Sequence, residues 1–186
     1  TGLVEDFTEL GFDTESVVLK SAQVHAPRYA SKSMNLPAGH LVHQILRLRF
    51  LDGEPLALHD SYIPIEIANE LLALDLDLGH TTLIDEISRL KGRPLEEDFQ
   101  GIDATVADAR ASARLGVPIG SPLLVIRRVF EVDSGGPPVF FESFFRSDRY
   151  YFSVQLAQSR KRKRLAKDNK NDNKRDQNGF GINDWF

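Results

Sequence analysis

The sequence predicts an α+β domain in which an antiparallel β-sheet is flanked by helices. Segments rich in Val, Ile, Leu and Phe occur in pairs joined by short Gly-containing turns, which is typical of β-hairpins. Segments with apolar residues at helical spacing lie between these pairs. This order favours an antiparallel sheet with the helices on one side, and 186 residues are enough for one domain with a sizeable core.

The N-terminal part combines a polar arm, a strand and a short helix. Residues 1–13 carry isolated apolar side chains and are expected to form a linker or an arm on the domain. Residues 16–26 are predicted to form a strand. Pro27 favours the first turn of a helix that reaches Met34, and residues 37–39 form a turn.

The clearest hairpin connects residues 41–51 with residues 55–63. The first segment is rich in Ile, Leu, Val and Phe, as expected of a long strand. Asp52-Gly53 is typical of the tight turn that joins two such strands.

Two helices are expected after the hairpin. Residues 64–74 carry apolar side chains on one helical stripe. Thr81 or Thr82 is expected to cap the second helix, which ends at Lys91-Gly92.

The rest of the chain continues the alternation. We predict an extended segment, an alanine-rich helix closed by Gly116, two strands joined by a Gly-Gly turn, and a last strand. These elements cover residues 95–106, 107–115, 123–132, 138–145 and 150–156, in that order.

Charge is distributed unevenly along the chain. Residues 160–186 contain nine Lys/Arg and four Asp, a formal charge of +5. Since the whole chain has a formal charge of −4, residues 1–159 carry −9. An acidic body repels DNA, so any contact with DNA is expected outside it. We expect the domain to span residues 14–157, followed at 158–186 by a basic tail that is disordered or foreign to the native protein.

Several classes of site are excluded by residue type and spacing. The chain has no cysteine, and its five histidines lack metal-ligand spacing, so no metal or cofactor is expected. It has no phosphate-binding loop, dinucleotide fingerprint or nucleophile elbow. No apolar run approaches the ~20 residues that span a bilayer and no signal peptide is recognisable, so we expect a cytoplasmic protein without membrane contact.

Arg47 and Arg49 form the most informative local feature. Residues two apart in a strand share a face, about 7 Å apart at the backbone. Two like charges on one face repel each other unless an anion lies between them, and guanidinium groups bind carboxylate or phosphate through paired hydrogen bonds. The pair is a candidate anion clamp; the alternatives are solvent-facing arginines or arginines paired with internal acids.

The residues opposite the arginine pair depend on the register of the hairpin. A two-residue loop pairs Arg47 with Leu58 and brings Asp60 to the face of Arg47 and Arg49. A three-residue loop shifts the pairing by one and brings His59 there instead. The sequence leaves both registers open.

Glu142 lies within an aromatic run at residues 140–146. Its bulky neighbours are expected to exclude solvent, which makes Glu142 a candidate carboxylate in an aromatic pocket. The favoured interpretation is an ion pair between Glu142 and Arg146, which share a strand face, beside core phenylalanines.

Short motifs follow one another in a specific order. They are Phe7-Thr8-Glu9 with Gly11, Arg47-Leu48-Arg49, Asp52-Gly53-Glu54-Pro55, Ser61-Tyr62-Ile63-Pro64, Leu115-Gly116-Val117 and Arg146-Ser147-Asp148-Arg149-Tyr150-Tyr151-Phe152. Together they resemble the UTRA domain, the C-terminal effector domain of HutC-type regulators in the GntR superfamily. The resemblance covers about residues 5–157, and the ordered set is specific although each motif is short.

The resemblance implies a chorismate-lyase-like fold, homodimerisation through this domain and a small anionic or polar effector. It also implies a winged helix-turn-helix DNA-binding domain ahead of Phe7-Thr8-Glu9, which is missing from this chain. We therefore expect a truncated or cleaved form that starts at the linker. Such a form would bind effector and dimerise, without specific binding to operator DNA.

Site residues are carried over one by one. Arg47 and Arg49 match the family's effector-anion arginines. Thr82 matches the serine of a Ser-x-Tyr pattern whose tyrosine is Ile84 here, although a threonine at a helix start is more often only a cap.

Three other positions depart from the pattern of sugar-phosphate-sensing members. His59 and Val139 stand where those members have glutamates, and Phe145 stands at a tyrosine. The carboxylates that would hold an amino sugar are thus missing, so we expect an anion with an apolar or aromatic body and His59 as a polar contact. The candidate ligand-binding residues are Arg47, Arg49, His59, Thr82, Glu142 and Phe145.

Three classes of function remain. The expected one is an effector-binding and dimerisation domain without catalytic activity. The alternative is a chorismate-lyase-like enzyme, for which Glu142 is the only acid expected to be buried. The third is a dimerisation module without a ligand.

Overall fold

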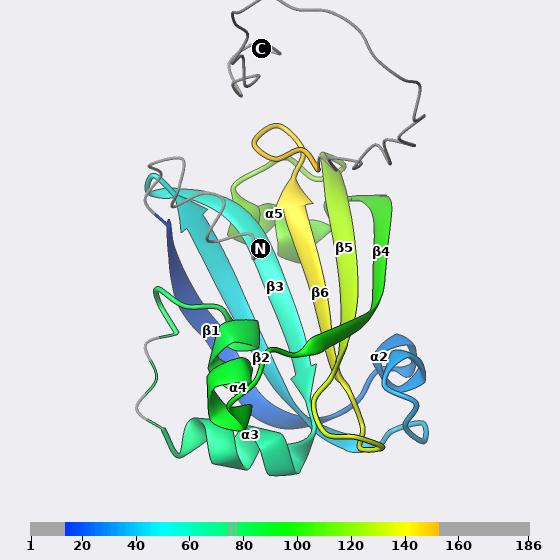
Figure 1. Ribbon diagram of the computed structural model, residues 1–186. Coiled ribbons are helices and arrows are strands. Elements are labelled where there is room, and N and C mark those ends of the chain that lie inside the picture. The colour runs from blue at the N-terminus through cyan, green and yellow to red at the C-terminus, as the bar shows by residue number, and fades with distance from the viewer. Residues whose placement is uncertain (1–13, 75, 77, 153–186) are drawn as a thin grey trace, which may run out of the picture. The chain divides into compact units, whose positions relative to one another are not determined.

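A computed structural model describes residues 14–74, 76 and 78–152, which form a six-stranded antiparallel sheet with helices on it (Figure 1). The sheet order is β1-β2-β3-β6-β5-β4. The elements are β1 (Thr14–His25), α2 (Arg28–Ser33), β2 (Leu41–Leu51), β3 (Glu54–Ile63), α3 (Ile65–Leu72), α4 (Leu83–Lys91), β4 (Glu96–Val106), α5 (Ala109–Leu115), β5 (Pro122–Glu131) and β6 (Val139–Arg146). The predicted α+β fold class is confirmed.

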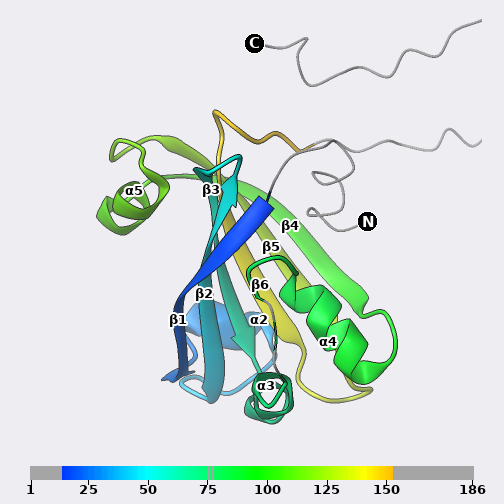
Figure 2. The same ribbon diagram turned by 90° about the vertical axis from the view of Figure 1, so that its left-hand side faces the viewer.

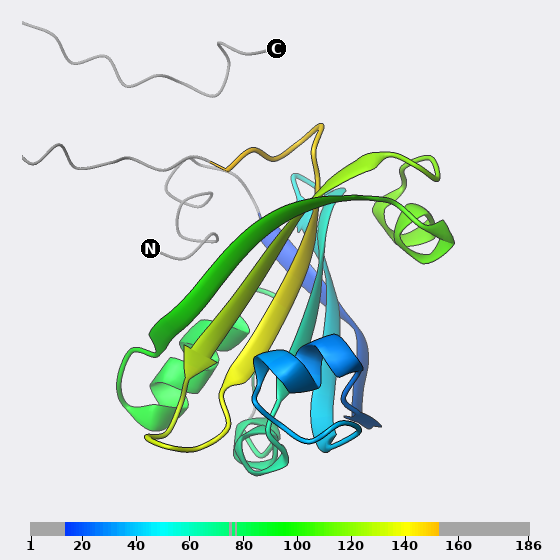
Figure 3. The same ribbon diagram turned by 90° about the vertical axis from the view of Figure 1, so that its right-hand side faces the viewer.

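Helices cover both faces of the sheet, not one face as the sequence suggested. Helices α3 and α4 pack on one face through a cluster that includes Ile45, Ile87 and Phe141. Helices α2 and α5 pack on the other through clusters around Met34 and Leu115. Figure 2 shows α4 and α5 on opposite sides of the sheet, and Figure 3 shows α2 on the same side as α5.

The two faces of the sheet carry different charged residues. The arginine face carries Arg47 and Arg49 and is covered by α3 and α4. The carboxylate face carries Asp60 and Glu142, which are cross-strand partners on β3 and β6, and is covered by α2 and α5.

The β2–β3 hairpin contains a feature that neither predicted register included. Its loop has two residues, Asp52 and Gly53, both with positive φ angles of 50° and 77°, as a type I′ turn requires. Leu56 has no partner, because Phe50 pairs with Pro55 while Arg49 pairs with Ala57. This β-bulge shifts the register by one residue and pairs Arg47 with His59.

The predicted caps explain where two helices begin and end. Thr82 Oγ1 accepts a hydrogen bond of 3.0 Å from the Asp85 backbone N–H at the start of α4. Gly92 ends α4 and Gly116 ends α5, both with a φ of 65° that glycine adopts without steric cost.

The prediction of a last strand at residues 150–156 is wrong for residues 150–152, which are the part of it that the structure describes. Tyr150 to Phe152 form no strand. Instead the Tyr150 ring stacks on Phe145 of β6, with ring centroids 4.2 Å apart. The rest of that segment, the expected arm at 1–13 and the expected tail at 158–186 lie outside the described residues.

Candidate functional site

Arg47 and Arg49 project from β2 on the arginine face of the sheet. Their exposed fractions are 4% and 2%, although each carries a guanidinium group. Strand β2 is flanked by β1 and β3, so both arginines project from an inner strand toward the covering segments. The alternative of solvent-facing arginines is therefore wrong.

The arginine pair is bonded to backbone carbonyls that follow α3. Arg47 Nη1 donates to Thr81 O at 3.0 Å and to Leu78 O at 3.3 Å. Arg49 Nη2 donates to Thr81 O at 3.4 Å. Carbonyl oxygens carry only a partial charge, so these bonds leave two guanidinium charges uncompensated.

The described residues supply no acidic partner to the pair. Within residues 14–74, 76 and 78–152, neither arginine forms an ion pair with a carboxylate. Burial, together with the neighbouring Arg49 guanidinium, lowers the pKa of Arg47 to about 10. Burial also lowers the pKa of Arg49. Guanidinium groups stay protonated at neutral pH, so Arg47 and Arg49 give the described part of the site a positive charge.

His59 is brought to the arginine face by the β-bulge. Its Nδ1 atom lies 2.8 Å from Ser143 Oγ on β6, and its Nε2 atom is buried without a partner. Burial of the ring and the charges of Arg47 and Arg49 hold its pKa well below 6.5, so the imidazole is neutral at pH 7. If Nδ1 accepts from the Ser143 hydroxyl, Nε2 carries the ring proton and is a donor; if Nδ1 donates, Nε2 is an acceptor.

Buried polar atoms without a partner concentrate at this place. Six such side-chain atoms occur in the described part of the chain, and five belong to the arginine face. Native proteins leave few buried polar groups unpaired, and ordered water or a bound ion usually satisfies such groups. The five are Ser16 Oγ, Arg47 Nε, Arg49 Nη1, His59 Nε2 and Ser61 Oγ.

An apolar wall adjoins these polar atoms. The Phe145 ring lies edge-on to His59, with centroids 5.6 Å apart, and its other neighbour is the stacked ring of Tyr150. Leu51 and Ile126 pack in the same cluster. The site thus combines a positive, hydrogen-bonding end with an aromatic and aliphatic wall.

Thr82 lies beside the site, but its hydroxyl is already used. Besides capping α4, the Thr82 hydroxyl donates to the Asp85 carboxylate. The backbone carbonyl of the preceding residue, Thr81, is the atom that faces both arginines. The structure therefore places Thr82 as a helix cap.

Glu142 does not lie with the other candidates. It projects from the carboxylate face, on the other side of the sheet from Arg47 and Arg49. Its expected ion pair with Arg146 is also wrong: Glu142 Oε1 accepts from Arg127 Nε at 2.7 Å, while Arg146 pairs with Asp148. The partner comes from the neighbouring strand β5, which the sequence did not indicate.

Sequence reasoning missed four residues that build the arginine-face site. Ser16 and Ser61 contribute polar atoms, Ser143 holds His59, and Tyr150 covers Phe145. A serine in a strand gives no signal of its own, so only the sheet order could have revealed these contacts.

Other kinds of site receive no support from the described residues. Among them, no group of three or more His, Cys, Asp or Glu side chains is arranged to hold a metal ion. None of the described helices is long and apolar enough to span a membrane.

Comparison with known families shows the family of the chain. The model of the UTRA domain family matches residues 9–151, which include every element of the sheet. The chain belongs to the UTRA domain family. The matched region includes Arg47 and Arg49, the β2–β3 hairpin and helix α4.

Individual relatives of this UTRA domain are transcriptional regulators. The chain is 25% identical over 152 residues to the HTH-type transcriptional repressor NagR of Bacillus subtilis, covering 82% of this chain and 61% of NagR. It is 30% identical to a candidate transcriptional regulator from Streptomyces coelicolor, with a TM-score of 0.66, covering 78% of this chain and 97% of that structure.

The effector domain of PhnF from Mycobacterium smegmatis has the same fold. Its TM-score is 0.71 at 21% identity, over 84% of this chain and 95% of that domain. The UTRA chain spans less than two thirds of NagR, so it corresponds to one part of that longer regulator. A regulator's effector-binding domain fits these relatives better than the enzyme alternative.

Proposed function

We propose that this UTRA domain binds a small anionic effector between Arg47, Arg49 and His59. One observation carries the proposal: two buried guanidinium groups lie among five unpaired polar atoms and pair with no carboxylate in the described residues. Leaving such atoms unpaired costs about 1–3 kcal/mol each. An anion would satisfy several of them at once and compensate both charges.

The wall of the site favours an anion with an apolar or aromatic body. Phe145 and Tyr150 present a stacked ring pair beside His59, whereas Asp60 and Glu142 project from the other face of the sheet and cannot receive sugar hydroxyls or an amino group there. An aromatic ring of the ligand would add offset or edge contacts with Phe145. A carboxylate on such a body would reach the arginines.

Binding would change the contacts of the segment before α4. Arg47 and Arg49 now donate to the carbonyls of Leu78 and Thr81, and an anion would compete for these donors. Within the same segment, Gly79 O accepts from the Ser16 backbone N–H at 2.7 Å, near the start of β1. Effector binding at the arginines is thereby linked to the end of the sheet where the chain enters the domain.

The regulatory role is an inference from the relatives. In a complete regulator, an N-terminal winged helix-turn-helix domain would contact DNA, and two UTRA domains would form a homodimer. The acidic charge of −9 before residue 160 supports DNA contact outside this domain. The domain itself would perform no chemistry.

The enzyme alternative is disfavoured by the position of its acid. A chorismate-lyase-like reaction would need a carboxylic acid beside the substrate held by the arginines, and Glu142 projects from the opposite face of the sheet. An assay for 4-hydroxybenzoate released from chorismate is expected to give no product above background.

A thermal-denaturation panel tests the effector class. We would titrate benzoate, phenylacetate, hexanoate and glucosamine 6-phosphate against the wild type and Arg47→Ala. An anion present at a hundredfold excess over its Kd adds about 2.7 kcal/mol to the free energy of unfolding. We expect stabilisation by the organic acids in the wild type only; stabilisation by glucosamine 6-phosphate alone would overturn the proposed ligand class.

A further inference from the structure

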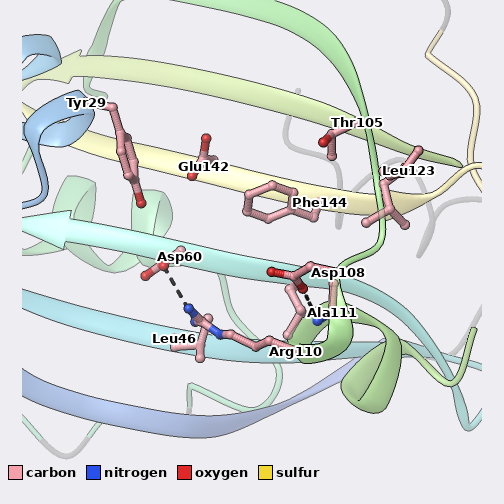
Figure 4. A pocket seen from close by; sticks show the side chains of 12 residues that line it. Tyr29, Leu46, Asp60, Thr105, Asp108, Arg110, Ala111, Leu123, Glu142 and Phe144 are labelled. Carbon is pink, nitrogen blue, oxygen red and sulfur yellow. Dashed lines mark hydrogen bonds and ion pairs between the residues drawn. The ribbon is translucent and has the colours of Figure 1, made fainter. Parts of the chain in front are cut away.

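A second cavity lies on the carboxylate face, separated from the arginine pair by the sheet. Its volume is about 260 Å³, and its lining includes Tyr29 of α2 and Arg110 and Ala111 of α5 (Figure 4). At one end of it lie Asp60 and Glu142. The proposed effector site does not use this cavity.

The two carboxylates are direct cross-strand neighbours. Asp60 on β3 pairs with Glu142 on β6, and each residue is only 5% exposed. Side chains at such positions have Cβ atoms about 5 Å apart, and like charges there destabilise a sheet. A positive charge between two such buried carboxylates would therefore stabilise the sheet.

The protein's own cations compensate this pair only in part. Arg127 Nε donates to Glu142 at 2.7 Å, but Arg127 also pairs with the exposed Asp103 at 3.3 Å. Among the described residues, Arg110 forms an ion pair with Asp60, with 3.9 Å between Nη2 and Oδ2 and 55% of the Arg110 side chain exposed. A pair of that length at an exposed position contributes little.

Asp60 is held by neutral donors instead. Gln44 Nε2 donates at 2.7 Å and Tyr62 Oη at 3.1 Å. Burial raises the pKa of Asp60 despite these bonds and despite the positive charges of Arg110 and Lys20. The carboxylate is thus fixed in position, while its charge is left incompletely balanced.

The remaining walls of the cavity are apolar and aromatic. Leu46, Leu58, Leu123 and Phe144 line it beside the carboxylates, and the ring of Tyr29 lies near Glu142 (Figure 4). No group of three metal-ligating residues occurs in the described residues, which argues against a metal ion here. A charged head next to an apolar wall matches an ammonium group on a hydrocarbon body.

We propose that this cavity binds a small organic cation, a primary ammonium whose head lies between Asp60 and Glu142 and whose body contacts Phe144 and Leu58. Charge-assisted hydrogen bonds to both carboxylates would hold the ammonium group. The Tyr29 and Phe144 rings would provide further attraction to a cation near their faces. This site is independent of the proposed anion site.

Calorimetric titration with benzylammonium tests the proposal near neutral pH and low salt. We expect saturable binding to the wild type with a Kd of about 1 mM or tighter. Asp60→Asn and Glu142→Gln keep the shape of the side chains and remove one charge each, so either is expected to weaken binding at least about tenfold. Benzyl alcohol, which has the same body without the charge, is expected not to bind.

Two control variants locate the site. Glu66→Gln removes an exposed carboxylate of α3, on the other face of the sheet, and Arg49→Ala alters the anion site; both are expected to bind benzylammonium like the wild type. The proposal is overturned if benzylammonium fails to bind up to about 10 mM, if benzyl alcohol binds equally well, or if both charge-removing variants, folded by circular dichroism, bind unchanged. A change of oligomeric state in Asp60→Asn, without any benzylammonium binding to the wild type, would assign the cavity to a second copy of the chain instead.

Discussion

His59 lies directly across the β2–β3 ladder from Arg47, and its ring is fixed from the other side by Ser143 at 2.8 Å. A neutral imidazole thus lies next to two buried guanidinium groups, with its Nε2 atom unpaired. This arrangement is unfavourable for the isolated domain, since buried charges and unpaired polar atoms both reduce stability. It is favourable for a domain that receives an anion.

Replacing Arg49 is expected to stabilise the domain while removing its response to anions. Arg49→Met keeps the length and the apolar contacts of the side chain and removes a buried charge whose hydrogen bond to Thr81 O is long, 3.4 Å. We expect the free energy of unfolding to rise by about 1–3 kcal/mol in the absence of ligand. Chemical denaturation measures this change.

The exposed Arg28 provides the matched control. Arg28→Met is expected to change stability by no more than about 0.5 kcal/mol. Destabilisation by Arg49→Met would indicate that Arg49 serves the fold and not a ligand.

His59 is expected to make stability depend on pH in the weakly acidic range. Its pKa is below 6.5 in the folded domain, because burial and the arginine charges disfavour the imidazolium, and returns to about 6.5 on unfolding. The unfolded chain therefore binds more protons as pH falls below about 7, and stability decreases by up to about 1.4 kcal/mol per pH unit.

A comparison of stabilities between pH 7 and 5 isolates this effect. His59→Gln lacks the titrating imidazole. His43, whose pKa is also lowered by burial, contributes to the pH dependence of both the wild type and the variant. The wild type is expected to lose more stability than the variant on acidification. Parallel curves would contradict the burial of an uncharged His59.

Phe145 is expected to select the body of the effector. Phe145→Leu removes the ring that lies between His59 and Tyr150 and costs about 1–2 kcal/mol of stability. We expect the affinity for benzoate to fall about three- to tenfold while the affinity for hexanoate is retained, since only the aromatic anion loses a ring–ring contact. Equal losses for both acids, measured by calorimetry, would count against an aromatic subsite.

Thr82 is expected to act through helix α4. Thr82→Ala removes the cap on the Asp85 N–H and should lower the free energy of unfolding by about 1 kcal/mol, whereas Thr82→Ser should retain it. Benzoate affinity should stay within about threefold of the wild type in both variants. A larger loss in Thr82→Ala alone would show that the hydroxyl contacts the anion.

Local signals in the sequence predicted most of the fold. The run of apolar residues and the Asp52-Gly53 turn gave the bounds of β2 as the structure has them, and residues with special turn or capping roles marked the ends of α4 and α5. The sides on which helices pack were not predictable in this way, since they depend on the order of the strands. That order, β1-β2-β3-β6-β5-β4, is set by contacts far apart in the chain.

The site was predictable only where it follows strand alternation. The alternation of side chains along a strand predicted that Arg47 and Arg49 share one face. It also predicted that Glu142 and Arg146 share a face, although these two residues form no ion pair with each other. The bulge at Leu56, which brings His59 to the arginines, left no pattern in the sequence. The actual partner of Glu142 lies on β5, so its pairing depended on tertiary structure as well.

The central claim is that a small anion binds to the arginine pair, and the most direct measurement follows the Arg47 side chain by NMR. We would record the Nε–H resonance of Arg47, a donor now buried without a partner, while titrating the acid that stabilises the wild type most. The account predicts a downfield shift that saturates with the calorimetric Kd and is lost in Arg49→Met. An unchanged Arg47 resonance at saturation, or no stabilisation by any anion of the panel, would contradict it.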